Sequence, residues 1–240
     1  MKFSFLLSSI CIGFWFPDVS LANTPSTIDI NQLSEPLKIV VGLSLLSLVP
    51  IVLVATTCFT RFIIVFSMLR FALGLQQTPP NVVLISLSIF LTIFVMSPTI
   101  SELNSTAINP YISGEITEAE MLTLAKQSAN RFMVSQTRKE DLALISRLAK
   151  SPMPNSLEEV KFTHLVPAFL LSELRTAFKI AFIIFLPFLL IDLVVSSVLM
   201  SLGMIMVPPT VISLPIKVLL FVVLDGWNLI TESLANSVVT

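Results

Sequence analysis

The chain has 240 residues, of which 55% are hydrophobic and 12% are charged, and its net charge at pH 7 is −1. A soluble domain carries about twice that charged fraction, so the composition indicates a membrane-associated protein and argues against nucleic acid as a partner. Two cysteines and one histidine are too few for a Cys/His metal site, and we expect neither a metal nor a cofactor.

The N-terminus has the pattern of a cleaved signal peptide. Lys2 precedes an apolar run from Phe3 to Phe16, and a polar segment then ends in Ser20-Leu21-Ala22. Small residues at the −3 and −1 positions are typical of a signal-peptidase site. We therefore expect residues 1–22 to be removed by cleavage between Ala22 and Asn23. An uncleaved anchor helix is the alternative.

Residues 23–36 are polar and are interpreted as a lead-in, and residues 37–100 as a first apolar helical hairpin. The apolar stretch from Leu37 to Leu75 is too long for one straight span, and we expect Pro50 to bend it. The adjacent Pro79 and Pro80 remove two helix donors and favour an extended conformation before them. They predict the tip of this hairpin.

Residues 101–166 differ sharply, because acidic and basic side chains alternate there with apolar residues at helical spacing. This pattern predicts a small helical domain in water. Thr117 and Glu120 have the spacing of a capping box at the start of one of its helices. The charged runs are interpreted as solvated faces of these helices.

Residues 167–240 are predicted to form a second apolar helical hairpin with a C-terminal tail, and Pro208 and Pro209 mark its tip. After a cleaved signal peptide, residue 23 starts outside the cytoplasm, so the charged domain would be periplasmic and both tips cytoplasmic. Arg61 and Arg70, near the first tip, agree with the positive-inside tendency. The expected fold is an all-α membrane-associated protein with two hairpins, broken at Pro-Pro tips, that flank a small helical periplasmic domain.

Several charged residues fall within the apolar helices, where an isolated charge is costly and is usually paired. They are Arg61, Arg70, Asp192, Asp225 and Lys217. Counted in residues from the two tips, Arg61 would lie level with Asp192 and Asp225. A structural charge pair and a proton or ion relay both remain open as interpretations.

Three long blocks resemble one known family. They are CFTRFIIVFSMLRFALGLQQTPPN (58–81), PAFLLSELRTAFKIAF (167–182) and FLPFLLIDLVVSSVLMSLGMIMVPPTVISLPIKVLLFVVLDGW (185–227). Together they are similar to the FliP/SctR family of type III secretion export-gate proteins, most closely to its flagellar branch. The resemblance extends from about Leu43 to Trp227.

The resemblance implies a non-enzymatic, pore-forming subunit of the flagellar protein export gate. Such a subunit would lie in the bacterial inner membrane within the flagellar basal body and would pass unfolded flagellar subunits during flagellum assembly. Its implied partners are further copies of itself, FliQ- and FliR-like proteins, other basal-body export components and membrane lipid.

The resemblance also implies roles for particular residues. Met200, Met204 and Met206, interrupted by Ile205, would form a gasket that lines the pore, since methionine is unbranched and adapts to a passing chain. The β-branched Ile205 is stiffer than its neighbours. Glu173 and Lys217 would bridge neighbouring copies. Without the resemblance, these methionines could equally be core filling.

Three other functions remain as alternatives. An injectisome export-gate subunit belongs to the same family. A small-molecule secondary transporter is suggested by the two similar halves with broken helices. An enzyme is disfavoured, because the sequence contains no evident nucleophile–base set or glycine-rich phosphate loop.

Overall fold

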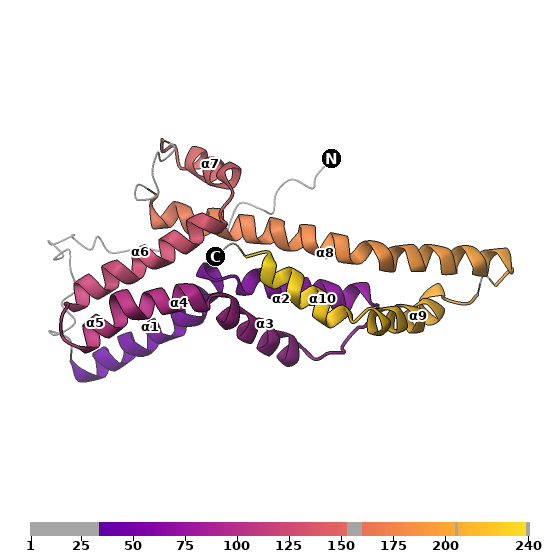
Figure 1. Ribbon diagram of the computed structural model, residues 1–240, viewed down its shortest axis with the longest axis horizontal. Coiled ribbons are helices and arrows are strands. Elements are labelled where there is room, and N and C mark those ends of the chain that lie inside the picture. The colour runs from indigo at the N-terminus through magenta and orange to yellow at the C-terminus, as the bar shows by residue number, and fades with distance from the viewer. Residues whose placement is uncertain (1–33, 153–159, 205, 239–240) are drawn as a thin grey trace, which may run out of the picture. The chain divides into compact units, whose positions relative to one another are not determined.

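The computed structural model describes residues 34–152, 160–204 and 206–238. The predicted signal peptide, its cleavage site at Ala22 and Asn23, and Ile205 lie outside the described residues. The described residues form helices and contain no strand, which confirms the predicted all-α fold. Figure 1 shows these helices in chain order from indigo to yellow.

The chain divides into two compact units, one ending at Ser47 and one beginning at Leu48. Helix α1 (Glu35–Thr56) crosses this boundary and runs without interruption through Pro50. Helix α1 therefore does not end at Pro50, and the expected bend there stays a prediction. The chain turns at Thr57 and Cys58. At that turn the hydroxyls of Thr57 and Thr60 donate to carbonyls near the end of α1, at Leu53 and Val54, and so satisfy groups that a helix end leaves free.

The second unit begins with α2 (Phe59–Ala72) and α3 (Asn81–Val95), which pack against each other. Helix α4 (Ser97–Leu103), a π-helical turn η2 (Asn104–Ile108) and α5 (Asn109–Ile112) follow. The axis of the segment Ser97–Ile112 is bent by 60° from that of α3. This bend directs the chain away from α2 and toward the charged region.

The charged region forms α6 (Glu118–Gln136) and α7 (Lys139–Leu148), both of which pack on α8. The predicted capping box at the start of α6 is confirmed: the backbone N–H of Glu120 donates to Thr117 Oγ1, and the backbone N–H of Thr117 donates to Glu120 Oε2. The buried carboxylate of Asp141, in α7, accepts from Ser172 and pairs with Arg175 of α8. The described part of the predicted 101–166 domain thus belongs to the second unit.

Helix α8 (Phe162–Ser201) is the longest, with 40 residues, and it runs through Pro167 and Pro187. Figure 1 shows α9 (Pro209–Val223) folding back beside the C-terminal part of α8, and the two helices are in contact. Helix α10 (Gly226–Asn236) follows after a bend of 65°. The second apolar region therefore forms a helical hairpin. Its returning arm consists of α9 and α10, with a bend between the two helices.

The core of the second unit lies where α2 meets α8 and α10. Phe62, Phe66 and Leu69 have the i, i+4, i+7 spacing of one helix face and are fully buried. Phe169 of α8 and Leu234 of α10 are buried in the same cluster. Burial of each such side chain stabilises the folded state by about 1.5–3 kcal/mol. Helix α2 therefore contributes a large part of the apolar core of this unit.

Two helical segments are long and apolar enough to cross a membrane, namely Ile39–Thr56 and α8, and the number rises to four if each bent pair is one span. These counts refer to the residues that the structure describes. The prediction of an apolar helical protein of the membrane class is confirmed at this level.

Candidate functional site

The two predicted tips share one backbone design. Helices α2 and α8 each end at a glycine in the left-handed region, Gly74 with φ 79° and Gly203 with φ 73°. The N–H of each glycine donates to the carbonyl three residues earlier, and the N–H of the next residue donates to the carbonyl five residues earlier. A side chain with a Cβ rarely adopts this conformation, which explains why glycine ends both helices.

The prolines then start the returning helices. Pro80 is the N-cap of α3, and Pro208 is the N-cap of α9 with Pro209 in its first turn. In GLQQTPP and GMIMVPP the glycine stands five residues before the first proline of the pair. This shared spacing was a readable signal that reasoning from the prolines alone missed. At both tips, a glycine ends one helix and a Pro-Pro pair begins the next.

Arg70 fastens the first tip. Its guanidinium Nη1 donates to the carbonyl of Pro79 at 3.1 Å and to Asn81 Oδ1 at 2.7 Å. A charge that the sequence placed within an apolar helix is thus used to bind the loop that follows the helix. This arrangement gives Arg70 a structural role at the tip.

The methionines at the second tip are exposed. Met200 is 70% exposed, Met204 is 42% exposed and Met206 is 95% exposed. If these methionines filled the core, their side chains would be buried. In the single chain they are exposed, so they do not fill its core. These exposed thioethers leave an apolar surface at the end of the α8–α9 hairpin.

Arg61 lies at the centre of a buried polar cluster. Its Nε donates to Glu173 Oε2 at 2.8 Å and its Nη2 to Glu173 Oε1 at 2.5 Å. Its Nη1 donates to the carbonyl and hydroxyl oxygens of Ser237, and Nη2 also donates to Gln136. One guanidinium thereby joins α2, α8, the end of α6 and the segment after α10.

Cys58 is buried one turn before this cluster. Burial raises the pKa of its thiol to about 12. The thiol therefore stays protonated at neutral pH and is a poor nucleophile. Within the described ranges no group of three or more His, Cys, Asp or Glu side chains could hold a metal ion.

Lys217 forms a second internal ion pair. Its Nζ lies 2.6 Å from Asp192 Oδ2 and donates to the carbonyl of Ala72 at 3.2 Å. This pair joins α9 to α8 and to the last residue of α2. Asp225, by contrast, is exposed and has a left-handed backbone conformation at the start of α10.

Arg61 binds Glu173 and neither aspartate, and its expected level with Asp192 and Asp225 stays a prediction. The residue count assumed straight helices up to each tip, whereas residues 73–80 form a turn and the chain bends at Asp225. Within one chain, Glu173 and Lys217 each have a different partner. A bridge between them in neighbouring copies would have to replace two internal ion pairs, and it stays a prediction.

Comparison with known proteins identifies the family. The FliP family model matches residues 42–234. The flagellar biosynthetic protein FliP of Bacillus subtilis is 49% identical over 215 residues, which is 90% of this chain and 97% of the relative. That of Aquifex aeolicus is 46% identical, with 86% and 87% covered, and that of Caulobacter vibrioides is 44% identical, with 92% and 85% covered.

The match covers both glycine–proline tips, the Arg61–Glu173 and Lys217–Asp192 ion pairs and the exposed methionine segment. Identity near one half over nearly the full length of these relatives is far beyond a shared local motif. The chain therefore belongs to the FliP family.

Proposed function

We propose that the protein is a pore-forming subunit of the flagellar type III protein export gate in the bacterial inner membrane. It would work as a homo-oligomer with FliQ- and FliR-like proteins and pass unfolded flagellar subunits during flagellum assembly. The family supports a role in flagellar biosynthesis, since the relatives named above are flagellar biosynthetic proteins.

The observation that carries the pore role is the exposed methionine segment at the tip of the α8–α9 hairpin. Large thioethers left in water are unfavourable, so this surface is expected to face an apolar or variable partner. A ring of such side chains, one segment from each copy, would repack around unfolded chains of any sequence and still hold back water and ions. Gly203 supports this role because it ends α8 and lets the segment leave the helix.

The test replaces Met204 and Met206 together with alanine in a flagellated host that lacks its own FliP. We expect the complex to assemble, the membrane to leak small ions, and export of flagellar subunits to become less controlled. Assembly is measured by native gel electrophoresis, and leakage by the membrane potential of the cells.

The chain offers a matched control at the other tip. Phe71 is 73% exposed and stands three residues before Gly74, as Met200 stands three residues before Gly203. Phe71→Ala is expected to leave the membrane tight. Unchanged ion leakage in the double methionine variant, or equal leakage in Phe71→Ala, would reject the gasket.

The same host distinguishes the injectisome alternative. Restored motility supports the flagellar assignment. Failure to restore motility together with restored secretion of effectors in an injectisome mutant would move the protein to that branch of the family.

A further inference from the structure

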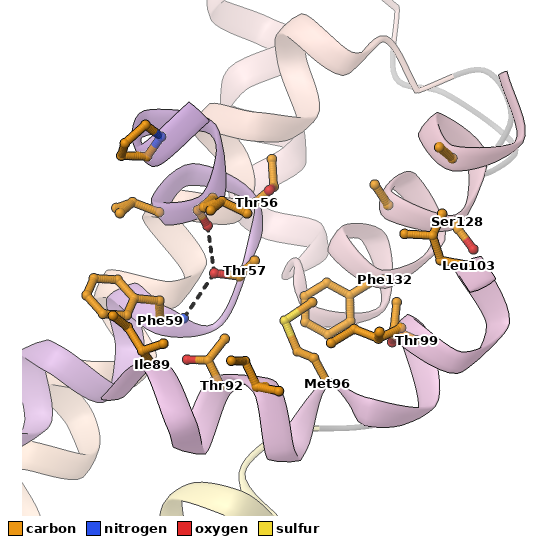
Figure 2. Close-up of a pocket in the computed structure, with 17 residues that line it drawn as sticks. Thr56, Thr57, Phe59, Ile89, Thr92, Met96, Thr99, Leu103, Ser128 and Phe132 are labelled. Atoms are coloured by element: carbon orange, nitrogen blue, oxygen red, sulfur yellow. Dashed lines mark hydrogen bonds between the residues drawn. The ribbon is translucent and has the colours of Figure 1, made fainter. Parts of the chain in front are cut away.

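An apolar pocket of about 570 Å³ lies away from the two tips, at the end of α1. Its walls come from the last turns of α1, the first residue of α2, the second half of α3, α4 and one face of α6. Figure 2 shows the residues that line it, with Thr92 and Met96 on one side and Phe132 and Ser128 on another. All of these residues belong to the second compact unit.

Small side chains and a helix bend create the space. Ala125, Ser128 and Ala129 present little volume on the face of α6 that lines the pocket. Opposite them, the chain bends by 60° between α3 and α4, at Met96. The helices therefore diverge where the α6 side chains are too short to fill the gap between them.

The lining offers almost nothing to a polar ligand. None of the seventeen lining residues is charged. The hydroxyls of Thr56, Thr57 and Thr92 already donate to backbone carbonyls four residues earlier, at 2.8, 2.6 and 2.6 Å, which leaves those of Thr99 and Ser128. A strongly polar or charged group that entered would lose most of its hydrogen bonds to water, which is unfavourable. The ligand that fits is a hydrocarbon.

The rim continues into surface that is suited to lipid. Leu53 is 55% exposed and Ile93 is 52% exposed, and both line the pocket. Leu53 belongs to the candidate membrane span Ile39–Thr56, and Ile93 belongs to the bent candidate span formed by α3 and the segment after it. An apolar pocket that opens between these candidate spans would be in contact with acyl chains where the spans cross a membrane.

An acyl chain matches this lining because it is apolar, needs no hydrogen-bond partner and can follow an irregular pocket. The pocket volume lies within the range of about 300–1,000 Å³ that is typical of small-molecule sites.

We propose that this pocket is a binding site for one acyl chain of a membrane phospholipid, held between α1, the α3–α4 bend and α6. The site binds the chain by apolar burial alone, so it selects for hydrocarbon and is indifferent to the headgroup. This proposal requires insertion in a membrane and is independent of the export role.

The test uses the full-length protein in nanodiscs of phosphatidylethanolamine and phosphatidylglycerol, a fraction of which carries a diazirine near the end of one acyl chain. After irradiation, peptides are mapped by mass spectrometry. We expect adducts on the pocket segments 93–103 and 125–132, with either headgroup, in addition to adducts on exposed surfaces of α1 and α8.

Filling the pocket should remove those adducts. Ala129→Phe places a ring in the space, and we expect loss of the adducts on both pocket segments with no change on α8. Ala119→Phe, on an exposed part of the same helix, is the matched control and should keep them. If Ala129→Phe fails to fold, as shown by a reactive Cys58 thiol, Ile93→Trp at the rim replaces it.

Two outcomes would overturn the proposal. The first is pocket adducts that persist unchanged in the filled variant, because the label would then have come from outside the pocket. The second is found with a photoreactive amino acid at position 93: capture of a second copy or of another protein, and not of lipid, would make the occupant a polypeptide.

Discussion

Arg61 and Glu173 form an ion pair with two hydrogen bonds in the interior, where their side chains are 2% and 0% exposed. The pair joins residues that are 112 positions apart in the chain. The remaining donors of Arg61 hold Gln136 and Ser237, so the pair also fixes the end of α6 and the segment after α10. Such a pair adds little net stability compared with apolar residues, but removing one partner leaves a buried charge unpaired.

The first prediction follows from this asymmetry. Arg61→Met should destabilise the protein by about 3–5 kcal/mol, because Glu173 would remain buried without its partner. The double variant Arg61→Met/Glu173→Leu should recover most of the loss. Chemical unfolding of the detergent-solubilised protein measures both effects.

The exposed pair of Arg131 and Glu102 is the control, with side chains 59% and 39% exposed. Arg131→Met should change the stability by about 0–1 kcal/mol. If Arg61→Met/Glu173→Leu were as unstable as Arg61→Met alone, the unpaired charge of Glu173 would not be the cause of the loss. The hydrogen bonds of Arg61 to Ser237 and Gln136 would then account for most of its contribution to stability.

Local features of the fold could be predicted from the sequence because each depends on a few adjacent residues. The Pro-Pro pairs predicted both helix starts, and Thr117 with Glu120 predicted the start of α6. The glycines five residues earlier could have predicted both helix ends in the same way. Helix α1 runs through Pro50 and ends at Thr56, just before the turn where the hydroxyls of Thr57 and Thr60 donate to carbonyls near its end.

The partners of the buried charges could not be predicted. Hydropathy and spacing indicate which charges need a partner, but the choice depends on how helices distant in the sequence pack together. Arg61 reaches Glu173 because α2 lies against α8, a fact that no local pattern contains. The pocket was equally hidden, since its volume depends on how far the bend at Met96 separates α3 from α6.

The second prediction concerns Gly226. A Cβ at this position would lie 2.2 Å from the ring of Phe221. That ring is buried and packs edge-on against Trp227, with 5.4 Å between the two ring centroids. Gly226→Ala should therefore cost about 1–3 kcal/mol through overpacking. Gly42 has no atom within 4 Å of such a Cβ, so Gly42→Ala should be neutral or slightly stabilising. Equal unfolding midpoints for the two variants would contradict this difference.

The third prediction concerns Cys58, whose burial raises the pKa of its thiol to about 12. In a Cys11→Ser background, maleimide at neutral pH should not label the folded protein and should label it fully in denaturant. Met206→Cys in the same background places a thiol at a position whose native side chain is 95% exposed, and it should react at once. Rapid labelling of Cys58 without denaturant would show that the region around Arg61 opens readily.

The fourth prediction is a pH dependence at the start of α6. Hydrogen bonds from the Thr117 backbone and hydroxyl lower the pKa of Glu120 below its ordinary value of 4.5. A lowered folded-state pKa means that the cap is fully formed above about pH 4.5 and is lost as the pH falls through the lower, folded-state value. The protection of residues 118–122 against hydrogen exchange, taken relative to the intrinsic exchange rate at each pH, should fall over that acidic range. In Glu120→Ala the protection should already be low at neutral pH, and an unchanged pH profile of protection in that variant would exclude the cap as the cause.

The last prediction asks which partner of Lys217 matters. Inside one chain, Lys217→Glu would place a carboxylate beside Asp192, and Glu173→Lys would place an ammonium beside Arg61. Each single variant should therefore be destabilised and should assemble and export poorly. The double variant Lys217→Asp/Asp192→Lys restores the internal pair and should recover stability and export. Glu173→Lys/Lys217→Glu leaves both like-charge contacts in place and should recover less of either, as measured by unfolding, native gel electrophoresis and secreted flagellar subunits. If this second double variant restored assembly better than the first, a bridge between neighbouring copies would outweigh the two pairs within the chain.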